Sequence, residues 1–528
     1  MNRRSFIQTL AASRLVAAQK KPNIVIMMAD DMGFSDLGCY GSEIRTPHID
    51  ALAAGGMRFT QFYNGARCCP TRASLLTGLY AHQAAVGHMV TDDHLPGYRG
   101  DLSRQAVTIA EVLKTAGYRT AMSGKWHVTP ANEKKHNWPM QRGFERYFGT
   151  IQGAGSYYDP AALVSGNEYI KPEGADFFYT DAIASHANKF IDEFAGQPFF
   201  LYVPFTSPHW PLHAIESDIA KYQGRYQDGW DALRVERHAR QVKMGIVDQR
   251  WPLSPRDEKV PAWGDAPNKE WEQRRMEVYA AQIDRMDQNV GRITAKLREK
   301  GLERDTLILF LADNGGCAEE IARALTPNPS IPMNTPDGRP VRRGNRPEIM
   351  PGPTDTYQSY GIGWANASNT PFRTFKHWVH EGGIASPLIA HWPAGITRKN
   401  SINTSPGHLI DLMATCVDVA GATYPATMAG QKITPLEGLS LRPVWERGKR
   451  AGHAEIFWEH EGNRAVRQGK WKLVSKYQLP WELYDLAADR SELHNRAATN
   501  AAKATELQTK WEAWAKRAQV EPWPVARR

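Results

Sequence analysis

Asn23-Ile-Val-Ile-Met-Met-Ala-Asp-Asp31 carries the strongest structural signal in this 528-residue chain. It is a nearly continuous apolar run of strand length that ends in two adjacent carboxylates. A strand with apolar side chains on both faces is typical of a parallel sheet covered by helices. The run therefore predicts a fully buried strand over residues 23–29.

Helical and extended patterns alternate after this strand. Pro47 opens a helical pattern that Gly55-Gly56 ends. Apolar residues from Tyr279 to Leu297 recur at intervals of four and three, which predicts an amphipathic helix ended by Gly301. Other patterns predict a helix over 107–115 and strands over 118–123, 199–205, 306–312 and 387–391. This alternation predicts a layered α/β sheet.

Two later segments depart from the alternation. Residues 318–369 are rich in Pro, Gly, Asn and Arg without periodicity, and so long a loop is usually functional or mobile. From 451 onward, short extended patterns precede a helical stretch over 501–518. We therefore expect a large α/β domain over 20–450, carrying the chemistry, and a C-terminal α+β subdomain with an antiparallel sheet over 451–528.

Composition narrows the class of protein. A hydrophobic content of 42% is ample for a folded core and excludes a disordered chain. The net charge is +9, but the basic residues are scattered, so we expect no nucleic-acid partner. Such a surplus fits either ordinary surface chemistry or an anionic substrate. Five cysteines are too few for a disulfide scaffold in a chain of this length.

The lengths of the apolar runs and the N-terminal residues indicate where in the cell the protein works. No run reaches 18 apolar residues, so we expect no transmembrane helix and no membrane partner. Arg3-Arg4 ahead of an apolar stretch resembles a twin-arginine export signal, with Val16-Ala17-Ala18 as its cleavage site. We expect residues 1–19 to be that signal and the protein to be periplasmic or exported; the alternative is an ordinary basic N-terminus on a cytoplasmic protein.

Side chains with oxygen atoms directly follow the ends of two predicted strands. Asp30 and Asp31 follow the strand at 23–29, and Asp313 and Asn314 follow the strand at 306–312. In such sheets, ligands collect at the carboxyl ends of the strands. Four oxygen donors without His or Cys suit Ca²⁺, with Mg²⁺ as the alternative, rather than zinc. Either pair alone would be read as a turn or helix cap; together they favour a metal site.

Cationic side chains also lie beside predicted strand ends. Lys125 and His127 are two residues apart after the strand at 118–123, and so face the same side of an extended loop. His209 follows the strand at 199–205, and Lys376 precedes the strand at 387–391. Each alone is usually a solvated lysine or a hydrogen-bonded structural histidine. Three such places together indicate an anion site.

The most specific signal is Cys68-Cys-Pro-Thr-Arg72, which continues into Ala73-Ser-Leu-Leu-Thr-Gly78. With six further motifs in the same order, the chain resembles the sulfatase family from residue 22 to beyond 480, and the bacterial arylsulfatases within it. The six motifs are Pro-Asn-Ile-Val at 22–25, Asp-Asp at 30–31, Gly-Lys-Trp-His at 124–127, Ser-Pro-His at 207–209, Asp-Asn-Gly-Gly at 313–316 and Lys-x-x-x-x-Glu-Gly-Gly at 376–383.

The resemblance implies an alkaline-phosphatase-like fold, a large mixed, mostly parallel sheet sandwiched by helices, and hydrolysis of sulfate monoesters. It implies that Cys68 is oxidised to formylglycine by a formylglycine-generating or sulfatase-maturating enzyme that reads Pro70 and Arg72. The hydrated aldehyde is a diol: one hydroxyl attacks sulfur, and deprotonation of the other expels sulfate.

Individual roles follow from the same resemblance. Asp30, Asp31, Asp313 and Asn314, together with the modified Cys68, match the calcium ligands. Arg72 would stabilise the diol, and Lys125 and Lys376 would bind sulfate oxygens. His209 would protonate the leaving oxygen, while His127 would help to deprotonate the second hydroxyl. Asp313 would also accept a proton from the attacking hydroxyl.

Three positions depart from the family pattern. Thr71 replaces the usual serine, Ala385-Ser386 replace an Arg-Val pair and so remove one cation, and Cys69 places a second thiol beside Cys68. The alternative functions are a phosphate or phosphonate monoester hydrolase of the same superfamily and an inactive sugar-binding homologue. A single oxygen-rich metal site favours a sulfate ester over a phosphate ester as the substrate. Every position that an inactive homologue could lose is present, which argues against an inactive protein.

The substrate is expected to be a sulfated small molecule or carbohydrate, with aryl sulfates as surrogates. Four aromatic side chains would either stack on a ring or lie in the core: Tyr157, Tyr158, Trp210 and Trp364. From the usual packing of the C-terminal subdomain, Trp458-Glu-His-Glu461 is expected to line the same cleft.

Overall fold

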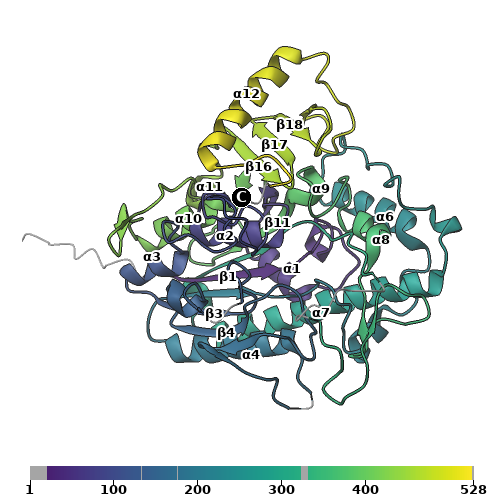
Figure 1. Ribbon diagram of the computed structural model, residues 1–528, viewed down its shortest axis with the longest axis horizontal. Helices are drawn as coiled ribbons and strands as arrows, with labels where there is room; N and C mark the ends of the chain where they lie inside the picture. The colour runs from purple at the N-terminus through teal and green to yellow at the C-terminus, as the bar shows by residue number, and fades with distance from the viewer. Residues whose placement is uncertain (1–20, 132–133, 175, 323–330, 526–528) are drawn as a thin grey trace, which may run out of the picture.

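The computed structural model describes residues 21–131, 134–174, 176–322 and 331–525. The expected export signal at 1–19 lies outside these residues. Helices cover both sides of a central sheet, and a smaller sheet with α12 stands at one end of the molecule (Figure 1). None of the described helices combines the length and the apolarity needed to cross a membrane.

The strand predicted at 23–29 is β1 (Asn23–Ala29), and all seven of its residues are buried. Its two neighbours, β7 (Phe199–Pro204) and β8 (Thr306–Ala312), both run parallel to it. The strand order of the large sheet is β12-β2-β11-β8-β1-β7-β3-β4-β5-β6, with β13 beside β2. Its other strands are β2 (Met57–Tyr63), β3 (Arg119–Ser123), β4 (Arg146–Thr150), β5 (Leu163–Ser165), β6 (Glu168–Tyr169), β11 (Ala385–His391), β12 (Ser401–Asn403) and β13 (Gly407–His408).

Antiparallel pairing is confined to part of this sheet. β11 runs antiparallel to both β2 and β8, and β5 runs antiparallel to β4 and β6. The other pairs are parallel. The large mixed, mostly parallel sheet is therefore confirmed.

Alternate residues of β1 enter two different apolar cores. Val25 and Met27 pack on the face covered by α1, α4 and α7, whereas Ile24 and Ile26 pack on the face covered by α2, α3 and α10. Full burial of each such side chain contributes about 1.5–3 kcal/mol, so burial on both faces holds β1 at the centre. These helices are α1 (Pro47–Ala54), α2 (Cys68–Thr77), α3 (Ile109–Thr115), α4 (Tyr179–Phe194), α7 (Lys269–Glu299) and α10 (Ile410–Ala420).

The C-terminal region forms the predicted small antiparallel sheet. Helix α12 (Ala501–Ala518) packs against it through Trp511 and Trp514. All neighbouring strands of this sheet run antiparallel, in the order β16 (Ile456–His460), β17 (Asn463–Gln468), β18 (Trp471–Ser475) and β19 (Glu482–Asp485).

The segment 318–369 is more ordered than its composition predicts. β9 (Arg342–Arg343) pairs with β10 (Thr356–Tyr357), and α8 (Gly361–Ser368) buries Trp364 against the rings of Trp230 and Trp263. Because α8 is short and buried almost all round, it shows no amphipathic period. The remaining elements are α5 (Glu216–Ile219), α6 (Gly229–Lys243), α9 (Glu381–Ile384), α11 (Arg442–Arg447), β14 (Thr427–Met428) and β15 (Gln431–Lys432).

Candidate active site

Four parallel strands end at the same edge of the large sheet, and each end contributes predicted site residues. Because parallel strands present their carboxyl ends together, side chains distant in sequence meet there. These side chains are Asp30 and Asp31 after β1, Asp313 and Asn314 after β8, Lys125 and His127 after β3, and His209 after β7.

Cys68 is the first residue of α2 and is 2% exposed. The backbone N–H groups of a first helical turn favour negative charge nearby. The sulfur atoms of Cys68 and Cys69 and a ring nitrogen of His127 lie within 4.8 Å of one another, and both thiols are free. A hydrogen bond from the Cys69 thiol, and then the charge of Lys125, hold the pKa of Cys68 well below its usual value despite burial. The surroundings of Cys68 therefore favour an anion.

Three buried carboxylates face three buried cations beside Cys68. Arg72 Nη2 lies 2.9 Å from Asp313 Oδ2 and 3.4 Å from Asp30 Oδ2. Lys125 Nζ lies 2.5 Å from Asp30 Oδ2. Lys376 Nζ lies 2.8 Å from Asp31 Oδ2, so the turn before β11 also reaches the site.

The carboxylates are crowded enough to perturb one another. Burial, and then the charge of Asp30, raise the pKa of Asp313 well above its usual value. Burial would also raise the pKa of Asp30, but Lys125 and Arg72 lower it below its usual range. A bound divalent cation would relieve the electrostatic repulsion between these buried carboxylates.

The donor set fits such a cation. Asp30 Oδ1 and Asn314 Oδ1 are buried and accept no hydrogen bond from the described residues. Asn314 Nδ2 donates to Asp31 Oδ1 at 2.7 Å, which leaves its amide oxygen free to act as a ligand. Buried polar atoms are usually satisfied, and unsatisfied carboxylate and amide oxygens suit Ca²⁺ or Mg²⁺. The structure also places the predicted site residue His209 beside Asp30 and Asp31, within reach of the ligand set rather than only of the substrate.

Both histidines are held in defined orientations. His127 has a left-handed backbone (φ 56°), and burial lowers its pKa to about 4, so its ring is neutral at pH 7. Gly153 lies so close that an added Cβ would stand 2.3 Å from the His127 ring. His209 donates its Nδ1–H to the carbonyl oxygen of Trp210 at 2.6 Å, and its Nε2 lies 3.3 Å from Asp31 Oδ2.

A cavity of about 540 Å³ connects these groups to solvent. Cys68, His127, His209 and Lys376 line it, while Asp30, Asp31, Arg72, Lys125, Asp313 and Asn314 are buried behind its wall. The wall also contains Arg67, Glu319, Gln152, Tyr357 and Met89–Thr91, none of which the sequence singled out. Two sequence signals point to some of them: Arg67 directly precedes the Cys68 motif, and Glu319 and Tyr357 lie in the long aperiodic segment 318–369.

The aromatic side chains divide between wall and core. Trp210 lines the cavity, whereas Tyr157 and Trp364 are fully buried, and Tyr158 lies outside the lining. The expectation that residues 458–461 line the cleft is wrong. Trp458 packs edge-on against Tyr63, and none of the four residues reaches the cavity wall, because the segment is directed into the interface with the large domain.

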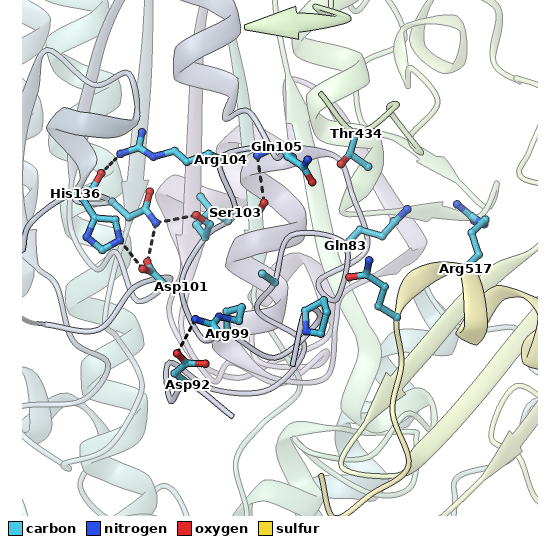
Figure 2. Close-up of a pocket in the computed structure, with 15 residues that line it drawn as sticks. Gln83, Asp92, Arg99, Asp101, Ser103, Arg104, Gln105, His136, Thr434 and Arg517 are labelled. Atoms are coloured by element: carbon cyan, nitrogen blue, oxygen red, sulfur yellow. Dashed lines mark hydrogen bonds and ion pairs between the residues drawn. The ribbon is translucent and has the colours of Figure 1, made fainter. Parts of the chain in front are cut away.

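A second cavity, of about 460 Å³, contains none of the predicted site residues (Figure 2). Asp92 pairs with Arg99 at 3.1 Å, and Asp101 pairs with His136 at 2.7 Å. Its described lining residues have no buried side-chain atom without a partner. The unsatisfied ligand atoms therefore distinguish the first cavity from this one.

Comparison with known proteins agrees with the geometry of the first cavity. The Sulfatase family model matches residues 22–422, and the model for N-sulphoglucosamine sulphohydrolase, C-terminal, matches residues 372–519. The chain is 32% identical to an arylsulfatase of Klebsiella aerogenes, over 85% of this chain and 97% of that protein. It is also 32% identical to an uncharacterized sulfatase of Schizosaccharomyces pombe, over 94% and 93% of the two chains.

Solved structures share the fold. Ps i-CgsB in complex with k-i-k-neocarrahexaose superposes with a TM-score of 0.67 at 23% identity, covering 94% of this chain and 93% of the other. BT4656 in complex with its substrate D-glucosamine-2-N,6-O-disulfate gives 0.64 at 21% identity, covering 95% and 98%. At such identities the likeness establishes the alkaline-phosphatase-like fold alone. The family match over most of the chain goes further: this protein belongs to the sulfatase family and is a sulfuric ester hydrolase.

Proposed function

We propose that this sulfatase hydrolyses sulfate monoesters of carbohydrates by means of a formylglycine formed from Cys68 and a Ca²⁺ held by Asp30, Asp31, Asp313 and Asn314. The observation that carries the proposal is the single cavity lined by Cys68, His127, His209 and Lys376. Buried cations and carboxylates surround it, so the site can accept both a divalent cation and an anionic ester group.

The oxygen ligands provide the cation site, for which Mg²⁺ is the alternative. When bound, the cation supplies positive charge to a sulfate oxygen. Asn314 and the three aspartates would hold it, and Arg72, Lys125 and Lys376 neutralise the same carboxylates from the other side. His209 lies close enough to Asp31 to complete the set or to remain a proton donor.

The position of Cys68 suits a nucleophile that carries negative charge. Formylglycine there would supply a hydrated aldehyde: one hydroxyl would displace the ester alcohol from sulfur, and loss of the proton of the other would expel sulfate and regenerate the aldehyde. Arg72 and the N-terminus of α2 stabilise negative charge at this position. His127, neutral above a pKa of about 4 and in contact with Cys68, can accept a proton there.

The remaining charged residues act on the ester group. Lys376 faces the cavity and Lys125 lies directly behind it, and charges held in a buried site stabilise developing charge far better than exposed ones. His209 holds its ring by the bond from Nδ1 to Trp210, so a proton on Nε2 is directed towards the leaving oxygen. Trp210 offers an aromatic face to a sugar ring.

Partners and location follow from the same proposal. Relatives of the same fold bind a neocarrahexaose and a glucosamine disulfate, which supports a sulfated carbohydrate as the substrate. Cys68, Pro70 and Arg72 are all buried, so we propose that the maturating enzyme reads this segment before the chain folds. Export through residues 1–19 would place the enzyme in the periplasm, which N-terminal sequencing of the mature protein tests.

The decisive experiment measures the mass of the peptide that contains Cys68 and the rate of aryl sulfate turnover. Trypsin should release residues 68–72 as one peptide, because Arg67 and Arg72 flank it. Its mass should be that of an aldehyde at Cys68 in protein produced with a maturating enzyme, and Cys68→Ala should lose turnover of an aryl sulfate while keeping its circular dichroism spectrum. Retained turnover in Cys68→Ala, or faster cleavage of the matching phosphate or phosphonate ester, would refute the proposal.

A further inference from the structure

Three side chains with metal-binding chemistry meet just outside the cavity wall. His88, His460 and Glu461 each present a ligand atom, and these atoms all lie within 4.8 Å of one another. They come from two distant parts of the chain, the segment before Met89–Thr91 of the wall and the end of β16 in the C-terminal sheet. The sequence motif at 458–461 had no role in the chemistry above.

His460 is the unusual member. Its side chain is 0% exposed, and neither ring nitrogen makes a hydrogen bond to the described residues. Buried polar nitrogens are almost always hydrogen-bonded or bound to a ligand, so both ring nitrogens of His460 lack an expected partner.

The distances fit one small ion. Ligand atoms held at about 2.0–2.1 Å from a tetrahedral zinc lie about 3.3 Å apart. His88 Nε2 lies 3.1 Å from Glu461 Oε1, and His460 Nε2 lies 3.6 Å from the same oxygen. The second distance is too long for a hydrogen bond, but the two together match ligands that share an ion.

A further histidine orients the carboxylate. His377 Nδ1 lies 2.8 Å from Glu461 Oε2, the oxygen turned away from His88, and His377 Nε2 lies 3.0 Å from Glu319 Oε1. Hydrogen bonds of this kind typically fix carboxylate ligands of metals. Glu461 is also one of two left-handed residues (φ 52°) in the β16–β17 turn, a place where Asn or Gly is usual. His88 and Glu461 are about a quarter exposed, so an ion can enter.

We propose that His88, His460 and Glu461 bind a zinc ion, with water as the fourth ligand, that joins the C-terminal sheet to the wall of the active-site cavity. Two imidazoles and one carboxylate suit zinc, whereas the all-oxygen set at Asp30, Asp31, Asp313 and Asn314 suits a hard cation. The two sites therefore differ in the metal that they select.

Calorimetric titration of zinc chloride into metal-stripped, full-length protein, with calcium present throughout, tests this site. The protein should bind one zinc per chain, and His460→Gln should weaken that binding by at least about 100-fold, since loss of an outer partner alone costs 10–100-fold. Zinc should raise the Tm of the parent protein and not of the variant. His94→Gln, which changes an exposed histidine, is the matched control and should bind zinc normally.

Other variants separate this site from the thiol pair and from catalysis. Cys68→Ser and Asp313→Asn should keep the zinc even where turnover is lost. If His460→Gln does not fold, Glu461→Gln, which changes a partly exposed residue of the β16–β17 turn, should lose the zinc instead. Cobalt in place of zinc should show no thiolate charge-transfer band. Failure of the parent protein to bind zinc, zinc binding unchanged in both His460→Gln and Glu461→Gln, or zinc lost in Cys68→Ser would overturn the proposal.

Discussion

Two clusters of buried charges can be compared in this molecule. One is the active site, where Asp31 and Lys376 lie beside a cavity with other charged groups. The other, the interface cluster, lies between α9 and the C-terminal sheet, where Lys472 Nζ stands 2.9 Å from Glu381 Oε1 and 2.8 Å from Glu492 Oε1. Arg490 Nε completes it, 2.7 Å from Glu381 Oε2.

The difference between them is what the charges face. In the interface cluster, cations and carboxylates meet one another from α9, β18 and the segment after β19, and all four side chains are 0% exposed. Arg490 Nη2 and Glu492 Oε1 make no hydrogen bond there, but the Arg490 guanidinium packs over the Phe372 ring and Glu492 Oε1 lies against Lys472 Nζ. In the active site, Asp30 Oδ1 and Asn314 Oδ1 have no such partner and lie behind the wall of a cavity. Buried charge that is matched internally holds layers together, whereas buried charge left unmatched beside a cavity is available to a ligand.

A change in the interface cluster should lower the stability of the protein more than any other change considered. Lys472→Met removes the cation between two buried carboxylates and should lower the free energy of unfolding by about 3–5 kcal/mol. Denaturant unfolding measures this, and kcat per folded molecule should not change. Lys470→Met, which changes an exposed lysine, should stay within about 0.5 kcal/mol. Equal stability of the two variants would contradict the comparison.

The corresponding change in the active site should act on rate. Lys376→Met removes a buried charge at the cavity and should lower kcat for an aryl sulfate by about 10²–10³-fold. Its unfolding free energy should fall less than that of Lys472→Met, because Asp31 keeps the Asn314 Nδ2 hydrogen bond at 2.7 Å. Steady-state kinetics beside denaturant unfolding measures both. Near-normal kcat with a large loss of stability would reverse the assignment of the two clusters.

A buried neutral histidine near the C-terminal sheet should make stability depend on pH. Burial lowers the pKa of His408 to about 3, so between pH 6.5 and 3 the unfolded chain binds one proton more than the folded chain. The contribution of His408 to the free energy of unfolding is complete above pH 6.5. It should fall by about 1.4 kcal/mol for each pH unit below 6.5. His408→Gln should remove that slope from unfolding measured between pH 6.5 and 4. An unchanged slope would show that His408 protonates in the folded state.

The smallest expected effect concerns the second thiol. Cys69 is fully buried in the core beneath α2. Cys69→Ala should cost about 1 kcal/mol of stability, as for a small cavity, and should leave aryl sulfate turnover and the aldehyde mass at Cys68 in place. Loss of turnover with the aldehyde still formed would assign Cys69 to the chemistry rather than to the core.

Much of the fold follows from local pattern. The strands at 23–29 and 306–312 were predicted to the residue, because a run that is apolar on both faces has few alternatives. The helix from Ala501 to about Ala518 was also predicted, and α12 ends at Ala518. Helix α8 was missed, since a short helix buried all round carries no period. The sequence analysis included Glu381 in a family motif but did not predict its ion pairs. Its partners Lys472 and Arg490 lie about 90 or more residues further along the chain, so no local pattern connects them.

Strand patterns and short motifs are local properties of adjacent residues, so they sufficed to identify this chain as a sulfatase with an α/β sheet. Which charges face a cavity and which face one another depends on tertiary packing. It alone brought His88 to His460 and Glu461, and Lys472 to Glu381. Such meetings depend on how strands pair and layers pack across hundreds of residues, and no local pattern encodes them.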